Sequence, residues 1–195
     1  MIDYFALLDQ PRAPWLDLET LKQAYHQKTF RAHPDTQTTG RAEEAAAAFS
    51  TLNEAYQTLH DPKRRLHHLL SLQGCAPSPA NQTIPEQLHD LFPSIGGLTQ
   101  RAGQLLEKFQ ATSNALSRSL LKPQLLELQK ETNELRARIQ NLSDASLAQL
   151  REINSRWMHN PEAQLASLSN LYFAFAYLTR WSAQLDEMAF QLSLL

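Results

Sequence analysis

The sequence predicts an all-α fold, and three observations support this prediction. Leu, Ala, Gln and Glu dominate the composition, and only 5 glycines occur in 195 residues. The alternation of apolar and polar residues that is typical of β-strands is absent, whereas apolar residues recur at the three- and four-residue spacing of an amphipathic helix. Three prolines from Cys75 to Pro85 mark a linker. We therefore expect an N-terminal helical domain at residues 1–74, a linker at residues 75–85 and a C-terminal antiparallel helix bundle at residues 86–195.

The N-terminal domain begins with a short apolar cluster at residues 4–8, which Pro11 and Pro14 end. Asp17 is a good N-cap for a helix over about residues 18–32. The spacing in this helix predicts an inner face with Leu18, Leu21 and Tyr25. Its outer face is expected to be basic, with Lys22, His26 and Arg31.

The sequence predicts two more helices in this domain. One covers about residues 41–59 and has a single apolar stripe: Ala45, Ala48, Phe49, Leu52, Ala55, Tyr56 and Leu59. Asp61 and Pro62 then supply an N-cap and a proline at the first position of a helix over residues 63–73, and Gly74 follows as its C′ residue. We interpret the basic run Lys63-Arg64-Arg65 as a solvated first turn.

The tripeptide His33-Pro34-Asp35 separates the second and third predicted helices. Pro34 lacks a backbone N–H and clashes with a preceding helical turn, so the second helix must end near Ala32. An imidazole and a carboxylate are therefore presented together at the tip of a helical hairpin. Such a tip suits recognition, because it is reachable at its end and held at its base.

The C-terminal part is expected to start with a short helix at residues 86–91, followed by a break at Pro93 and Gly96-Gly97. Longer helices then cover about residues 98–121, 123–141, 145–159 and 161–192. Pro123 and Pro161 suit the first position of a helix. Ser143-Asp144 is expected to be a break, although one continuous helix remains an alternative.

Five short motifs follow one another over residues 1–73. They are Asp3-Tyr4-Phe5-x-Leu7-Leu8, Leu21-x-x-x-Tyr25, His33-Pro34-Asp35, Leu52-Asn53-Glu54-Ala55-Tyr56-Gln57-Thr58-Leu59 and Asp61-Pro62-x-Arg64-Arg65. Their order and spacing resemble the J-domain co-chaperones. Within that family the chain is most similar to HscB, the J-protein of iron–sulfur cluster assembly, in its opening motif, in Leu69-Leu70-Ser71-Leu72-Gln73-Gly74 and in the direct joining of a J-domain to a helical bundle.

The resemblance implies a J-domain that binds a DnaK-type ATPase chaperone and stimulates its ATP hydrolysis. Asp35 would accept a contact from a basic residue of the chaperone, Pro34 would hold the geometry, and His33 would add a polar contact. The basic face of the second helix would steer an acidic partner. None of these residues would perform chemistry, so the protein is expected to be no enzyme and to need no cofactor.

The bundle would hold a client protein, and the HscB resemblance implies the iron–sulfur cluster scaffold. The candidate residues for an exposed apolar patch are Leu88, Leu91, Phe92, Phe173 and Phe175. For the run Leu171–Leu178, the core of the bundle is the alternative interpretation. This run is apolar on every face of the predicted helix, so one face must pack inside the bundle and the other is free to bind.

Several positions depart from the pattern of the family. J-domains usually carry leucine and tyrosine where this chain has Lys28 and Ala32, and glycine is common at the position of Asp9. The entry to the bundle, residues 87–93, has few acidic residues. These departures favour an alternative function: a J-like helical adaptor or oligomerisation protein without ATPase-stimulating activity.

Other classes of function are disfavoured by composition. A net charge of -2 argues against a general nucleic-acid binder. The single Cys75 excludes an internal disulfide and a multi-cysteine zinc site, and His60, His67 and His68 have no third ligand at metal spacing. No basic segment precedes an apolar stretch at the N-terminus, and no window has the roughly 18 apolar residues of a membrane span. We therefore expect a cytoplasmic protein with no membrane, nucleic-acid or metal partner.

Overall fold

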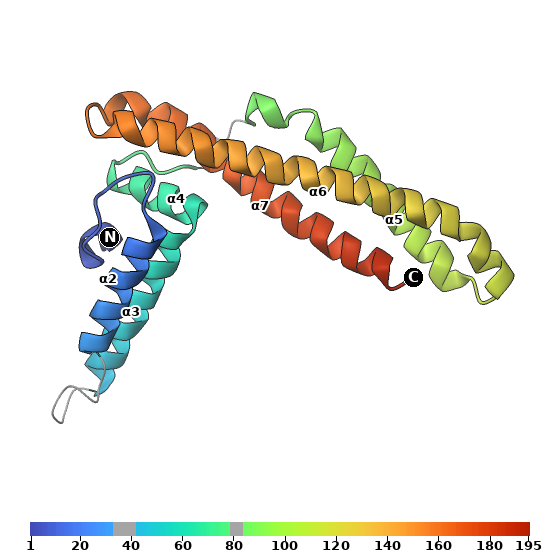
Figure 1. The fold of residues 1–195 in the computed structure, drawn as a ribbon, viewed down its shortest axis with the longest axis horizontal. Coiled ribbons are helices and arrows are strands. Elements are labelled where there is room, and N and C mark those ends of the chain that lie inside the picture. The colour runs from blue at the N-terminus through green and yellow to red at the C-terminus, as the bar shows by residue number, and fades with distance from the viewer. Residues whose placement is uncertain (33–41, 79–83) are drawn as a thin grey trace. The chain divides into compact units, whose positions relative to one another are not determined.

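The computed structural model describes residues 1–32, 42–78 and 84–195. The described residues form helices, turns and irregular segments, with no strand among them, and this confirms the predicted all-α class (Figure 1). No helix in the described part of the chain is long and apolar enough to cross a membrane.

The chain divides into two compact units. The first contains Met1–Gln82 and Ala148–Tyr172, and the second contains Thr83–Leu147 and Phe173–Leu195. Hydrogen bonds explain why the later segment groups with the N-terminal residues: Trp157 Nε1 donates to Arg12 O at 2.7 Å, and Trp15 N donates to Asn154 Oδ1 at 3.2 Å. The linker over residues 75–85 stays a prediction, because contacts between segments do not show which part of the chain folds independently.

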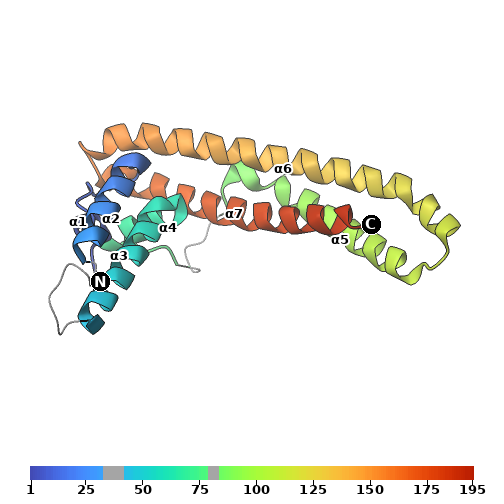
Figure 2. The same cartoon turned by 60° about the horizontal axis from the view of Figure 1, so that its bottom comes forward.

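The first unit begins with four helices: α1 (Tyr4–Leu7), α2 (Leu18–Ala32), α3 (Ala42–His60) and α4 (Pro62–Leu72). In Figures 1 and 2, α2 and α3 lie side by side as a hairpin. The observed bounds agree with the expected ones to within about a residue, since the capping residues fix them.

The predicted caps are present. Asp17 Oδ2 accepts from Thr20 N at 3.2 Å, and Asp61 Oδ1 accepts from Arg64 N at 2.7 Å, so each carboxylate satisfies an N–H that has no partner within its helix. Pro62 takes the first position of α4. Gly74 follows α4 with a φ of 74°, a left-handed conformation that glycine adopts without strain.

The core of the first unit includes fully buried apolar side chains from all four helices and the loop after α1: Phe5, Leu8, Leu21, Leu59, Leu66, Leu69 and Leu70. Three described residues of the predicted inner stripes are exposed instead, and Ala48 in the first half of α3 is one of them. Leu18 is 42% exposed at the first position of α2, and Phe49 is 41% exposed in the first half of α3. Leu52, Ala55 and Leu59 of the same stripe are buried.

The second unit is built mainly from three long helices: α5 (Leu91–Ala111), α6 (Ala115–Trp157) and α7 (Leu165–Ser193). Short 3₁₀ turns precede α5 at Glu86–Leu88 and α7 at Glu162–Gln164. Both α6 and α7 also contribute residues to the first unit. Figure 1 shows the parts of the three helices that belong to the second unit running alongside one another.

Several predicted breaks in this region are wrong. Pro93 and Gly96-Gly97 lie inside α5, and Pro123 lies inside α6 rather than at its start. Pro93 is tolerated because it falls in the first turn, where the N–H groups have no partner within the helix. The apolar spacing of Leu91, Ile95 and Leu98 continues past the glycines and packs into one core, which outweighs their low helix propensity. At Ser143-Asp144 the alternative of one continuous helix is correct, because α6 runs through both residues. The break between the first two long helices lies after Ala111, where α5 ends, and not at Lys122 before Pro123.

Candidate functional site

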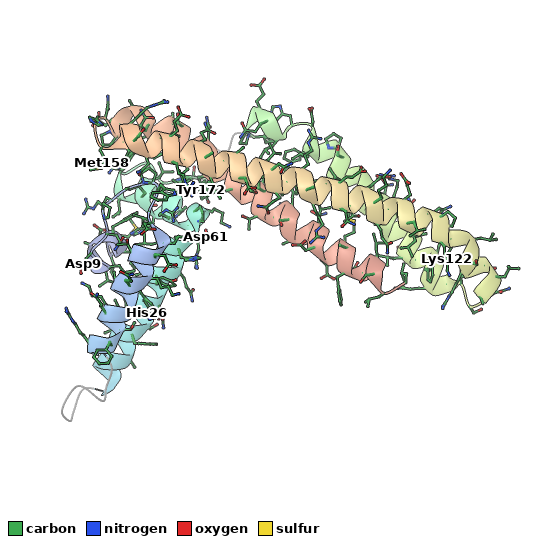
Figure 3. The ribbon with its side chains drawn as sticks, in the orientation of Figure 1. Asp9, His26, Asp61, Lys122, Met158 and Tyr172 are labelled. Carbon is green, nitrogen blue, oxygen red and sulfur yellow. The ribbon has the colours of Figure 1, made fainter. Side chains whose placement is uncertain are left out.

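The outer face of α2 is the part of the predicted chaperone-binding surface that the structure describes. Lys22 and His26 lie four residues apart on one side of the helix, and both are exposed; Figure 3 labels His26. Arg31 is exposed too, but it follows Lys22 by nine residues and so lies on the opposite side of α2, which makes the prediction of one basic face wrong for Arg31. His33, Pro34 and Asp35 lie outside the described residues. The side shared by Lys22 and His26 therefore has one permanent cation and one imidazole, and it offers a modest positive potential to an acidic partner.

The hairpin that carries this face is held together by aromatic and polar contacts. The Tyr25 hydroxyl donates to Asn53 Oδ1, and the rings of Tyr25 and Tyr56 stack with centroids 4.5 Å apart. Both contacts join α2 to α3. The role of Asn53 was not predicted. The signal is a polar residue three positions before Tyr56 on α3, since a half-buried tyrosine hydroxyl such as that of Tyr25 needs a hydrogen-bond partner.

Arg65 holds the base of the hairpin and is buried, so the prediction of a solvated first turn is wrong for this residue. Its guanidinium donates to Pro14 O at 2.8 Å and, through Nη1, to Leu59 O at 2.5 Å and His60 O at 3.4 Å. The last two carbonyls are at the C-terminus of α3, where they have no partner within the helix. Burial lowers the pKa of Arg65 to about 10, which leaves it charged at neutral pH.

The N-terminal helix α1 is attached through His68. Tyr4 N donates to His68 Nε2 at 3.1 Å, and the rings of Tyr4 and His68 stack with centroids 4.6 Å apart. An imidazole nitrogen accepts a hydrogen bond only when it is unprotonated, and burial lowers the pKa of His68 in agreement with a neutral ring. Nε2 is therefore engaged and unavailable to a metal. Within the described ranges, no three side chains suited to metal binding gather.

Two of the departures from the J-domain pattern lie together. Asp9 has a φ of 52°, the left-handed region in which glycine is favoured and Asp is better tolerated than most residues. Its carboxylate contacts Lys28 Nζ at 2.7 Å. A lysine at this position of α2 therefore has a partner, and the hairpin forms without the usual leucine.

The residues expected to bind a client are largely buried. Leu88 and Leu91 are fully buried in the core of the second unit, and Phe92 packs against that core with its ring edge-on to Trp181 at 4.7 Å. Phe173 and Phe175 are 5% and 6% exposed. The expectation of an exposed apolar patch is therefore wrong, because these side chains fill space between helices. The alternative interpretation of Leu171–Leu178 as core agrees with their burial.

Comparison with known proteins finds a family match for the N-terminal region. Residues 3–68 match the model of the DnaJ domain. The HscB homologue of Paraburkholderia phymatum, a co-chaperone, is 40% identical over 86 residues, which are 43% of this chain and 49% of the relative. The co-chaperone HscB of Proteus mirabilis is 36% identical over 104 residues, which are 51% and 57% of the two chains. The chain thus spans about half the length of the curated relatives it matches.

Solved structures extend the likeness to the whole fold. Chaperone HscB from Vibrio cholerae has a TM-score of 0.53 and 19% identity, over 98% of this chain and 99% of that one. The human co-chaperone HscB has a TM-score of 0.54 and 17% identity, over 95% and 81% of the chains. At such low identity the likeness shows the fold alone. Residues 3–68 therefore match a DnaJ domain, and the fold of the chain is similar to that of the HscB co-chaperones.

Proposed function

We propose that this protein is a co-chaperone that binds a DnaK-type ATPase chaperone and stimulates its ATP hydrolysis. The observation that carries the proposal is the match of residues 3–68 to the DnaJ domain, in which α2 carries exposed basic side chains and precedes His33-Pro34-Asp35 in the sequence. The chaperone contacts assigned to this surface are Lys22, His26, Arg31, His33, Pro34 and Asp35.

Each group has a physical role in this proposal. The cations of α2 speed the encounter with an acidic surface, an effect that salt weakens. Asp35 accepts from a basic residue of the chaperone, and a charge-assisted hydrogen bond of this kind contributes about 1.5–3 kcal/mol. The contact stimulates hydrolysis only if it is stronger in one state of the chaperone than in the other, because a ligand shifts an equilibrium by its difference in affinity.

The second part of the proposal concerns the client. The resemblance to HscB favours the iron–sulfur cluster scaffold protein as the cargo, delivered by the helices of the second unit. The burial of Leu88 and Leu91 means that these two side chains serve the core, so the client has to be recognised by other residues of this unit.

The test is the steady-state ATPase rate of a DnaK-type chaperone from the same source. It is measured with the wild-type protein and with Asp35→Asn, each with and without the scaffold protein. Lys22→Ala is compared with Lys122→Ala, which removes an equally exposed cation from α6. We expect stimulation that needs Asp35, that increases with the scaffold, and that becomes less sensitive to salt in Lys22→Ala only.

Two results would change the assignment. If stimulation persists in Asp35→Asn, the proposed chaperone contact is wrong. If the wild-type protein stimulates no chaperone and still forms a stable complex with a partner protein, the adaptor function replaces the co-chaperone function.

A further inference from the structure

A cavity in the first unit is lined by side chains from α1, α3, α4 and α7. It measures about 280 Å³, close to the lower end of the range of about 300–1,000 Å³ that is usual for small-molecule sites. Most of its lining can donate hydrogen bonds: Tyr4, Thr58, Lys63, Arg64, His67 and Tyr172, the last of which Figure 3 labels. The cavity therefore has the size and the polarity of a site for a small ligand.

The cations of this cavity come from one side of α4. Lys63 and Arg64 precede His67 by four and three residues, so the three side chains are neighbours on the helix. Lys63 is half-buried and Arg64 is exposed, and neither forms an ion pair with another described residue. The Asp61 carboxylate serves as the helix cap instead, since it accepts from Arg64 N at 2.7 Å. Two permanent positive charges therefore line the cavity without a salt bridge to the described part of the chain.

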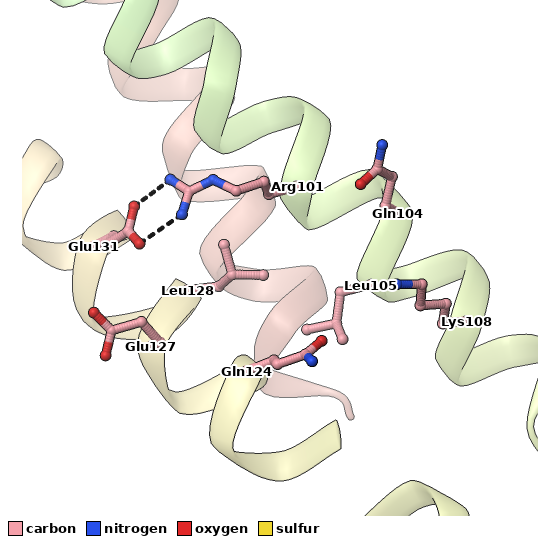
Figure 4. Close-up of a pocket in the computed structure, with 8 residues that line it drawn as sticks. All are labelled: Arg101, Gln104, Leu105, Lys108, Gln124, Glu127, Leu128 and Glu131. Carbon is pink, nitrogen blue, oxygen red and sulfur yellow. Dashed lines mark hydrogen bonds and ion pairs between the residues drawn. The ribbon is translucent and has the colours of Figure 1, made fainter. Parts of the chain in front are cut away.

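A groove between α5 and α6 in the second unit shows what such an arginine looks like when it is paired (Figure 4). The floor of this groove contains the buried side chains Leu105 and Leu128. At its edge, Arg101 Nη1 donates to Glu131 Oε1 at 2.8 Å, and Arg101 Nη2 donates to Glu131 Oε2. That contact is bidentate and neutralises Arg101. The guanidinium of Arg64 has no such partner among the described residues, so it is available to a ligand.

The hydroxyl of Thr58 is the observation that points most directly to a ligand. Thr58 lies in the last turn of α3 and is 8% exposed. It makes no side-chain hydrogen bond to another described residue, whereas Thr29 and Thr51 each donate to the carbonyl four residues earlier. No fully buried side-chain polar atom in the described ranges lacks a partner, so this hydroxyl has to open onto the cavity that it lines. A largely buried hydroxyl is costly unless water or a ligand completes its hydrogen bond.

The charge around the cavity is positive on balance. One acid, Glu54, acts on the Tyr4 side of it: burial and a hydrogen bond to Glu54 raise the pKa of Tyr4, while the positive charge of Arg64 lowers it. Glu54 is thus engaged with the Tyr4 hydroxyl. His68 also lines the cavity, but it adds no charge because burial lowers its pKa. Lys63 and Arg64 therefore outweigh the one carboxylate.

These groups match a phosphate better than a carboxylate. A carboxylate has one negative charge, whereas a phosphate monoester has a charge of roughly −1.5 to −2 at neutral pH and three strong acceptor oxygens. Two cations and a hydroxyl donor satisfy the larger charge and the third oxygen. Arginine binds two phosphate oxygens at once, and lysine is a common phosphate ligand as a point charge.

We propose that this cavity binds a small phosphate monoester. Lys63, Arg64 and Thr58 hold the phosphate, and the organic group lies against the rings of His67 and Tyr172, whose centroids are 5.6 Å apart. None of these residues belongs to the surface assigned to the chaperone, so the inference does not depend on the proposed co-chaperone function.

The test is isothermal titration calorimetry of the full-length chain with glycerol 3-phosphate, and with acetate, at constant ionic strength. Lys63→Gln and Arg64→Gln remove the two charges, and Thr58→Val removes the hydroxyl while keeping the shape of the side chain. The matched controls are Arg151→Gln and Lys122→Gln, which remove exposed cations outside the cavity. Circular dichroism melts verify that each variant is folded. A flotation assay compares phosphatidylcholine vesicles with and without phosphatidic acid, which has the same phosphate monoester on a lipid.

We expect glycerol 3-phosphate to bind, and Lys63→Gln and Arg64→Gln each to weaken binding by about fivefold or more, because each loses a charge-assisted contact at a partly exposed site. Thr58→Val should weaken it by about twofold or more, and each control should change it by less than about twofold. Absence of binding to the wild-type chain would overturn the inference, and so would equal effects in cavity and control variants. Acetate that binds as tightly as the phosphate would show that the site selects any anion. Binding to phosphatidic acid vesicles without binding to glycerol 3-phosphate would assign the surface to a membrane, which also overturns the inference.

Discussion

Replacing Arg65 tests how the base of the α2–α3 hairpin is held together. Arg65→Ala removes the donor from two well-formed hydrogen bonds, to Pro14 O at 2.8 Å and Leu59 O at 2.5 Å. A buried carbonyl that loses its partner costs about 1–3 kcal/mol, so the two together predict a loss of about 2–6 kcal/mol. The third bond, to His60 O at 3.4 Å, is too long to add much. A loss of this size is a large part of the 5–15 kcal/mol that stabilises typical domains.

Two variants make the prediction specific. Arg65→Lys keeps the charge but has no planar group that reaches both Pro14 O and Leu59 O. Its free energy of unfolding should therefore lie between that of Arg65→Ala and that of the wild type. Arg64→Ala is the control, because this neighbouring arginine is exposed, and it should change stability by less than about 0.5 kcal/mol.

The measurement is urea unfolding followed by far-ultraviolet circular dichroism, together with hydrogen exchange read by mass spectrometry. Exchange in Arg65→Ala should accelerate in peptides from α3 and α4 and stay unchanged in peptides from α5. An unfolding free energy within about 1 kcal/mol of wild type would refute the reasoning, since the carbonyls would then have found other partners at little cost.

Two more predictions concern His68 and Pro123. Burial lowers the pKa of His68, so the folded protein binds a proton at this ring less readily than the unfolded chain, whose imidazole has a pKa near 6.5. The free energy of unfolding should therefore be constant above about pH 7.5 and should decrease as the pH falls through about 6.5. Thermal melts from pH 5 to 8 should show this slope in wild type and a flatter one in His68→Gln, and identical slopes would contradict the assignment. Pro123 lies inside α6 and lacks the N–H that would continue the hydrogen bonds of the helix. Pro123→Ala should therefore raise the free energy of unfolding, measured in urea, by about 1–3 kcal/mol. A destabilised variant would contradict this and would show that the proline fits a local bend.

The helices of the N-terminal region were predictable because local chemistry determines their ends. Asp17, Asp61 and Gly74 act within one helical turn, through a carboxylate on a free N–H or a backbone with positive φ, and these effects do not depend on the rest of the fold. The same local rules failed for Gly96-Gly97 and Pro123. There the apolar residues of α5 and α6 pack into one continuous core, and this tertiary packing outweighs the local preference for a break.

The candidate site was predictable only in part. Exposure of Lys22 and His26 followed from helical spacing on α2, and the resemblance to J-domains pointed to this face. Burial of Leu88 and Leu91 could not be read from the sequence, because an apolar residue in a short helix looks the same whether a neighbouring helix covers it or not. The groove at Leu105 and Leu128 was also invisible, since it depends on which residues of α5 and α6 face each other.

The contact between Asp9 and Lys28 has a consequence for building hybrid J-domains. Each residue alone looks unfavourable: an acid on a left-handed backbone, and a charged side chain where the family usually has leucine. Together they form one interaction, so the effect of changing either depends on the other. A hybrid that takes α2 from a relative with leucine at position 28 would leave Asp9 strained and without its cation, whereas an exchange of the whole segment from position 9 to position 28 would transfer the pair intact.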